Sequence, residues 1–253
     1  MKSFYKYSVS ILSIAFLFAC GGGGGGGGNV VVNADPQGLW KGTNSSSQAT
    51  VNIAVLDNGE AWGIFSEGAS LLGAIYGNAT TNGNNISASG KAINFETPSS
   101  SSVNLTGTVA AKSTMTLATL GVSIPLVYQP SYETAATANA IAGTWSFDAR
   151  LVRSGNVNTP PTDTITIDDA GAFSVGNSFC QISGSVTPQS GGKNIYSLTM
   201  SVTGLLDVCD VPSSMSGIVY IDTSVTPNKF FSLALSPNKD DAVFAIGQKE
   251  VVN

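Results

Sequence analysis

The chain has 253 residues, with 16 acidic against 11 basic residues and no histidine. Because only 11% of its residues are charged and the balance is acidic, it lacks the basic surface that nucleic acids require. Without histidine it cannot form a Ser-His-Asp or Cys-His catalytic set, a typical zinc site or a histidine-bound haem. We therefore expect no nucleic-acid partner, no metal and no cofactor, and we expect that the protein is not an enzyme.

Residues 1–19 have the features of a secretory signal peptide. Two lysines precede a short apolar run at 9–18, which is shorter than the ~20 residues that a membrane-spanning helix needs. The segment LFAC at 17–20 resembles the lipobox of bacterial lipoproteins. In that family the signal is cleaved before the cysteine, so the resemblance implies that Cys20 carries a lipid and anchors the chain to a membrane. An ordinary signal peptide that ends in cysteine is the alternative.

Residues 20–34 are expected to form a glycine-rich tether. The eight consecutive glycines at 21–28 disfavour regular structure, because glycine loses the most conformational entropy on ordering. Their root-mean-square reach is roughly 15 Å. A glycine rather than an aspartate follows Cys20, and by similarity to enterobacterial sorting this implies the outer membrane. Glycine runs also occur in surface-exposed lipoproteins, so the surface is slightly favoured over the periplasmic face.

The rest of the chain reads as two copies of one module. The segment GLWKGT at 38–43 is echoed by AGTWSF at 142–147, and later strands and turns follow in the same order. Within each copy the hydrophobic period is two, as in VNIAV at 51–55, and turn signals such as DNG at 57–59 separate the runs. We count about eight short strands per copy.

This pattern predicts an all-β protein with two tandem antiparallel up-and-down barrels of about eight strands each. Barrel closure removes exposed strand edges, whereas a sandwich, the alternative, retains them. The first barrel is expected at 35–130, a linker at 131–141 and the second barrel at 142–253.

The Gly-x-Trp segments at 38–40 and 143–145 resemble the opening strand of lipocalin-like barrels. In that family the tryptophan plugs one end of the barrel, which implies that Trp40 and Trp145 are barrel-end core residues. An arginine from the last strand covers it there. Lys249 stands near that position in the second copy, and Gln129 in the first.

The order of lipidated cysteine, glycine-rich spacer and small barrels resembles Gram-negative surface lipoproteins such as factor H-binding protein and transferrin-binding protein B. This resemblance implies a binding module for a macromolecular partner, either a protein or a glycan. It is a resemblance of architecture, and it supplies no binding residues.

The two remaining cysteines, Cys180 and Cys209, predict a disulfide in an exported domain, with two free thiols as the alternative. Such a bond would contribute roughly 3–4 kcal/mol in the chain-entropy model. The loop at 202–215 around Cys209 is the longest insertion of the second copy. It could be a recognition loop, or it could cap the barrel end. Its apolar residues are Leu205, Leu206, Val208 and Val211.

Three further groups of residues have two readings each. Trp62 and Tyr76 lack counterparts in the second copy, so they are either ligand contacts or core residues. The S-x-x-K pattern at 190–193 lies in a glycine-rich hairpin and indicates a turn rather than a serine enzyme. The aspartates at 168–169 and 207–210 supply too few ligands for calcium.

Two functions that involve a partner or ligand remain open at this level, beside an envelope-structural role with no ligand. The first is a lipid-anchored binding module for a macromolecular partner. The alternative is a lipocalin-like carrier that holds a small apolar ligand inside one barrel, preferably the second. An internal volume large enough for a ligand favours the carrier, and a filled interior with an apolar loop favours the binding module.

Overall fold

The computed structural model describes residues 31–44, 46–68, 70–97, 99–119, 122–153, 156–159, 164–176, 180–204 and 214–251. Val32–Asn253 form one compact unit. The predicted signal peptide and Cys20 lie outside the described residues, as do Leu205, Leu206, Val208, Cys209 and Val211. Among the described residues, no helix has both the length and the apolar character needed to cross a membrane.

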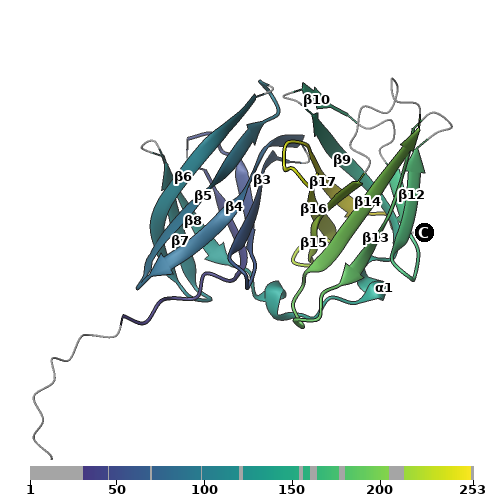
Figure 1. The fold of residues 1–253 in the computed structure, drawn as a ribbon. Helices are drawn as coiled ribbons and strands as arrows, with labels where there is room; N and C mark the ends of the chain where they lie inside the picture. The colour runs from purple at the N-terminus through teal and green to yellow at the C-terminus, as the bar shows by residue number, and fades with distance from the viewer. Residues whose placement is uncertain are drawn as a thin grey trace, which may run out of the picture. The chain divides into compact units, whose positions relative to one another are not determined.

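The first barrel is a closed sheet of eight antiparallel strands, each paired with its neighbours in sequence (Figure 1). Closure joins the first strand to the last, where Trp40 lies opposite Tyr128. The predicted up-and-down topology is therefore confirmed, and this sheet has no open edge. Its strands are β1 (Gly38–Thr43), β2 (Thr50–Val55), β3 (Glu60–Glu67), β4 (Ser70–Asn82), β5 (Asn85–Asn94), β6 (Ser99–Ala110), β7 (Thr114–Thr119) and β8 (Val122–Tyr128).

The second barrel repeats this plan with one long strand that pairs on both sides. Strand β9 pairs through residues 143–146 with β11 and through residues 145–152 with β17, which closes the sheet. The short β10 pairs with the far end of β9. The predicted all-β fold of two tandem eight-stranded barrels is confirmed. The strands are β9 (Gly143–Arg153), β10 (Asn156–Asn158), β11 (Thr164–Ile167), β12 (Ala172–Gly176), β13 (Cys180–Pro188), β14 (Tyr196–Gly204), β15 (Ser214–Asp222), β16 (Lys229–Leu235) and β17 (Ala242–Lys249).

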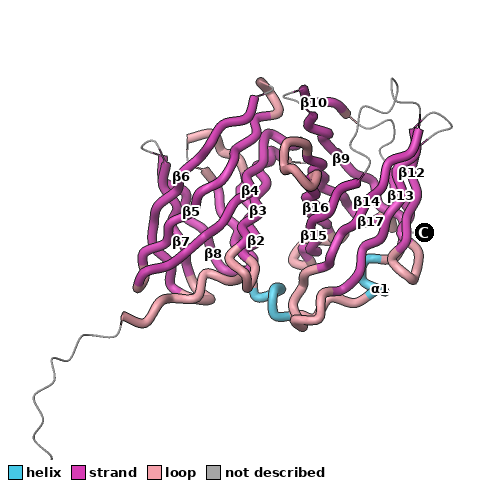
Figure 2. The backbone as a smooth tube through the Cα atoms, in the orientation of Figure 1, coloured by secondary structure: helices cyan, strands magenta, loops and turns pink. Residues whose placement is uncertain are grey.

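The segment between the barrels contains two short helical turns, drawn in cyan in Figure 2. They are the 3-10 helix η1 (Pro130–Glu133) and the helix α1 (Ala138–Ile141). Tyr132 is buried in the same apolar cluster as the first barrel, and Ile141 is buried in the core of the second. The linking segment is therefore packed against both barrels.

Most strands follow the period-two pattern of a barrel wall that faces water on one side. Along β6, buried Leu105 and Val109 alternate with exposed Asn104, Thr106 and Thr108. Successive strand residues point to opposite faces, so the apolar set lines the interior. The outward positions here carry hydroxyl and amide side chains, as the serine- and threonine-rich composition predicts.

Strands β16 and β17 depart from this pattern, because both of their faces are buried. Every residue of 230–235 is buried, including the outward-facing Phe231. Phe231 and Phe244 belong to one apolar cluster with Trp62 and Tyr76, which lie on the outer face of the first barrel. The outer faces of the two barrels therefore cover each other within this compact unit.

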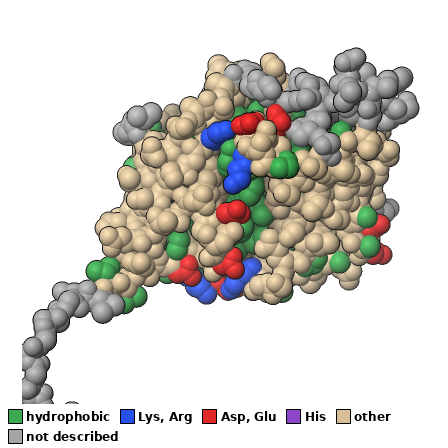
Figure 3. Space-filling model, viewed as in Figure 1, with side chains coloured by type: hydrophobic (Ala, Val, Ile, Leu, Met, Phe, Trp, Pro, Cys, Tyr) green, Lys and Arg blue, Asp and Glu red, His purple; other side chains and the backbone are tan. Residues whose placement is uncertain are grey.

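Ion pairs accompany this apolar contact between the barrels. The Nζ atom of Lys41 lies 2.9 Å from a carboxylate oxygen of Asp222, and that of Lys91 lies 3.3 Å from Asp240. Burial raises the pKa of Asp222, but hydrogen bonds from Ser224 and Lys41 outweigh it, so the net direction is downward. On the face in Figure 3, charged side chains gather along this boundary rather than over the barrel walls.

A carboxylate in the linking segment holds groups from both barrels. Glu133 accepts a hydrogen bond from the Tyr128 hydroxyl at 2.5 Å and lies 2.8 Å from the Nζ atom of Lys112, both in the first barrel. Its other oxygen lies 2.5 Å from the Nζ atom of Lys193, in the β13–β14 turn of the second barrel. Hydrogen bonds from Lys112, Lys193 and Tyr128 lower the pKa of Glu133 to about 2.

We predict that Phe244→Ala destabilises the protein strongly. Phe244 is 0% exposed, and its ring centroid lies 5.4 Å from that of Phe95 in the first barrel. Removing a fully buried aromatic ring costs about 3–5 kcal/mol in the free energy of unfolding, which urea denaturation measures. The control Val127→Ala, at an outward position that is 57% exposed, should change that free energy by less than about 0.5 kcal/mol. Equal effects of the two substitutions would show that the contact between the barrels contributes little stability.

We predict that Glu133→Gln makes the free energy of unfolding less dependent on pH in the acid range. A carboxyl group whose pKa is lowered on folding stabilises the protein above its unfolded value of 4.5, and this contribution is lost as the pH falls toward about 2. Urea midpoints measured between pH 6 and pH 2 should therefore fall less steeply in the variant than in the wild type. Parallel curves would contradict a role for this carboxylate.

Candidate functional site

The interior of the second barrel contains an apolar cavity of about 80 Å³. Its lining comes from the helix α1 and from eight strands, β9 and β11–β17, and the described part of the lining contains no charged side chain. The lining residues are Ile141, Phe147, Ala149, Leu151, Ile165, Ile167, Phe173, Val175, Gly176, Ile182, Val186, Leu198, Met200, Val219, Phe230, Ser232, Val243 and Ala245.

A row of small side chains accounts for the empty space. Ser232 on β16 lies opposite Ala245 on β17, and Ala245 lies opposite Ala149 on β9. These three residues point inward on adjacent strands, so one part of the wall carries little volume. Across the cavity the wall carries bulkier side chains, among them Phe173 and Met200. The cavity therefore follows from three neighbouring strands that place small residues at one level of the barrel.

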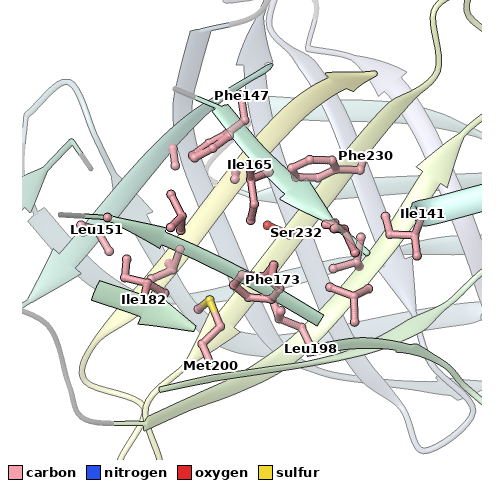
Figure 4. A pocket seen from close by; sticks show the side chains of 18 residues that line it. Ile141, Phe147, Leu151, Ile165, Phe173, Ile182, Leu198, Met200, Phe230 and Ser232 are labelled. Atoms are coloured by element: carbon pink, nitrogen blue, oxygen red, sulfur yellow. The ribbon is translucent and has the colours of Figure 1, made fainter. Parts of the chain in front are cut away.

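The chemistry of this cavity is that of a site for a neutral molecule. Figure 4 shows the hydroxyl oxygen of Ser232 among carbon side chains such as those of Phe230 and Ile165, and the thioether of Met200 lines another part of the cavity. Ser232 carries the one polar side chain among the lining residues that the structure describes. Because an unpaired charge is costly in such surroundings, the cavity suits an apolar molecule with at most one hydrogen-bonding group.

Trp145 closes one end of this barrel. Its indole is 0% exposed and donates a hydrogen bond of 2.8 Å from Nε1 to the carbonyl oxygen of Ile141. The Nζ atom of Lys249 lies 5.3 Å from the centre of the indole ring and donates to the carbonyl oxygen of Ala140. The edge of the Phe230 ring packs on the same indole, with 5.2 Å between ring centroids. Lys249 thus covers Trp145, at the position that the sequence comparison singled out.

Trp40 occupies the equivalent place in the first barrel. It is 1% exposed, and its Nε1 donates a hydrogen bond of 2.9 Å to the carbonyl oxygen of Pro36, again four residues earlier. Tyr128 packs edge-on against it at 5.3 Å, whereas the side chain of Gln129 donates to the carbonyl oxygen of Val127. The two copies therefore share the tryptophan and its hydrogen bond, and they differ in the residue that covers the ring.

The glycine before each tryptophan has a conformational reason. Gly38 has φ +153° and Gly143 has φ +118°, a region that other residues rarely adopt. A Cβ atom on Gly38 would also lie 2.5 Å from the ring of Tyr128. The glycine of the Gly-x-Trp pattern thus allows the backbone conformation with which the chain enters the first strand of each barrel.

Trp62 and Tyr76 lie on the outer face of the first barrel, where they pair across β3 and β4. Each is 8% exposed because the second barrel covers it, and the Tyr76 hydroxyl donates a hydrogen bond of 2.7 Å to the carbonyl oxygen of Lys239. The Nε1 of Trp62 has no hydrogen-bond partner among the described residues. These side chains are therefore buried core residues, which is one of the two readings from the sequence, and the core that they join is the contact between the barrels.

The remaining sequence candidates take structural places or lie outside the described residues. Residues 190–193 form a turn, and Lys193 pairs with Glu133 there. The carboxylate of Asp168 accepts the backbone amides of Ala170 and Ala172 in its own turn. No group of three potential metal ligands occurs in the described part of the chain. The loop at 202–215 is described only at its two ends, and the Cys180–Cys209 disulfide therefore stays a prediction.

Sequence reasoning missed the small-residue row at Ser232, Ala245 and Ala149. The signal was present in principle, since all three stand at inward positions of period-two strands. Their alignment at one level depends on the register of β9, β16 and β17, and the sequence does not fix that register. The apolar runs KFFSLAL and AVFAIG, in contrast, indicate strands buried on both faces, and they could have located the contact between the barrels.

The comparisons with known proteins give little beyond this geometry. No protein-family model and no curated protein matches the chain. Two crystal structures of variants of the vaccine antigen transferrin-binding protein B from Haemophilus parasuis are similar at 9% and 10% sequence identity, with TM-scores of 0.29 and 0.30. Each match covers 81% of this chain and 66% of the other, so this chain spans just under two thirds of their length. At these TM-scores we take neither a function nor a partner from the likeness.

Proposed function

We propose that the protein is a lipid-anchored envelope protein that carries a small apolar ligand inside its second barrel. The sequence supports the anchor through the lipobox-like segment that ends at Cys20, and the glycine-rich tether would hold the barrels away from the outer membrane. The observation that carries the ligand proposal is the cavity of about 80 Å³ inside the barrel, in which Ser232 supplies the one polar side chain among the described lining residues. Such a lining favours apolar molecules and leaves one hydrogen bond for orientation.

The volume limits the size of the ligand. It is roughly half that of the ~150 Å³ engineered cavity that takes benzene. A short alkyl chain or a single ring therefore fits only if the side chain of a lining residue changes its conformation. Met200 is suited to this, because its unbranched thioether chain rotates about three bonds and fills irregular spaces.

A macromolecular partner has less support from the described surface. The exposed large hydrophobic side chains among the described residues are four valines: Val31, Val32, Val127 and Val251. A contiguous apolar patch is the usual mark of a protein-binding surface. The predicted recognition loop lies outside the described residues, so we rank the carrier first.

We predict that benzene stabilises the Val32–Asn253 unit through this cavity. A ligand that binds the folded state alone raises the unfolding temperature as its concentration exceeds its dissociation constant. Thermal unfolding followed by circular dichroism, with increasing benzene, should show this rise in the wild type. The variant Ala245→Leu fills the small-residue row and should lose the rise, whereas Ala92→Leu, the same change inside the first barrel, should keep it.

Two results would overturn this assignment. One is a wild-type unfolding temperature that stays constant up to saturating benzene. The other is an equal rise in Ala245→Leu, which would place the benzene elsewhere. If Ala245→Leu does not fold, Ala149→Val fills the same row with a smaller change. Phenol in place of benzene tests the hydroxyl group of Ser232, because phenol can form a hydrogen bond with it. The variant Ser232→Ala should weaken phenol binding by up to about tenfold and leave benzene binding unchanged.

A further inference from the structure

The interior of the first barrel is filled with side chains at one end and hollow at the other. At the Trp40 end its interior holds large, fully buried side chains, among them Met115 and Leu126. Toward the other end, Gly73 on β4 and the paired Ala92 and Ser101 on β5 and β6 take the inward positions. Small residues on three consecutive strands leave this half of the barrel hollow.

The hollow half forms a cavity of about 490 Å³ that opens at the end away from Trp40. This lies within the roughly 300–1,000 Å³ of sites for small-molecule ligands. Its floor and walls are apolar and include Leu105, Leu117 and Ile124. An alkyl chain inserted here would contact aliphatic side chains on several strands.

The rim of this cavity is polar and, in the part of the chain that the structure describes, nearly uncharged. Asn44, Asn94, Ser99 and Thr119 contribute to it, together with one carboxylate from Glu96 and no lysine or arginine. The side-chain oxygen of Asn94 accepts the amides of Glu96 and Thr97, and that of Asn44 accepts the amide of Ser46. Each asparagine therefore offers its NH₂ group, a donor, to a ligand.

We propose that this cavity binds a neutral single-chain amphiphile, with the alkyl chain inside the first barrel and an uncharged acceptor-bearing head at the rim. Hydroxyls and amide donors can satisfy ester, amide or hydroxyl oxygens. An anionic head would gain no cationic partner from the described rim and would lie near Glu96. The site differs in position and chemistry from the cavity of the second barrel, and it stands or falls independently of the proposed function.

The probes are 1-decanoylglycerol and decanoate, which share a chain length and differ in head-group charge. Isothermal titration calorimetry on the Val32–Asn253 unit, below the aggregation thresholds of both, should show about fivefold or more tighter binding of 1-decanoylglycerol. Glu96→Gln should narrow that difference by improving decanoate binding. Ala92→Leu should weaken 1-decanoylglycerol binding at least about tenfold, because it fills the hollow half.

Ala245→Leu is the matched control, since it makes the same change inside the other barrel, and it should bind 1-decanoylglycerol as the wild type does. If Ala92→Leu fails to fold, Ser101→Val fills the neighbouring inward position. Equal binding by the wild type and the filled variants would mean adsorption outside the barrel and would overturn the proposal. Tighter binding of decanoate than of 1-decanoylglycerol would overturn the neutral head group.

Discussion

Apolar side chains on the outer faces of the two barrels pack against each other, and this contact explains why two strands are buried on both faces. An antiparallel barrel wall normally faces water on its outside and alternates accordingly. Here β16 and β17 bury both faces, with Phe231 and Phe244 packed in one cluster with Trp62 of the first barrel. The two barrels are therefore not independent domains, because each covers apolar side chains on the outer face of the other.

This contact also determines which cavity walls can move. The small-residue row of the second barrel lies on β9, β16 and β17, and the outer faces of these strands pack on the first barrel. That wall is backed by a second layer of protein. The opposite wall, on β12–β14, has outward residues such as Ser174, Thr199 and Ser201 in contact with solvent. Met200 lies in this wall. The flexible lining residue is therefore in the wall that has solvent, rather than the first barrel, on its outer side.

The two interiors show how one module supports two chemistries. Both barrels are plugged at the same end by a tryptophan that donates to a carbonyl four residues earlier. Beyond the plug, the second barrel is lined by phenylalanine and branched aliphatic residues and keeps a small apolar space. The first barrel has small residues at Gly73 and Ala92 and a rim of neutral polar groups. The two barrels share one topology. A few differences among their inward-facing residues thus give one barrel an apolar cavity and the other an amphipathic cavity.

Period-two alternation and turn signals are local patterns, so they were enough to predict the fold class and the duplication. The resemblance of Gly-x-Trp to lipocalin-like barrels pointed to the two tryptophans. The resemblance also drew attention to Lys249, which stands near the position of the covering arginine and whose Nζ atom lies over the Trp145 ring. The place of Trp62 and Tyr76 in the contact between the barrels could not be read from the sequence, because they are buried by residues more than 150 positions away in the chain. One example is the hydrogen bond from Tyr76 to Lys239, in the turn between β16 and β17. The cavities also depend on tertiary packing. Whether Ser232, Ala245 and Ala149 meet at one level depends on strand register and barrel closure, and these are set by the packing of all eight strands together.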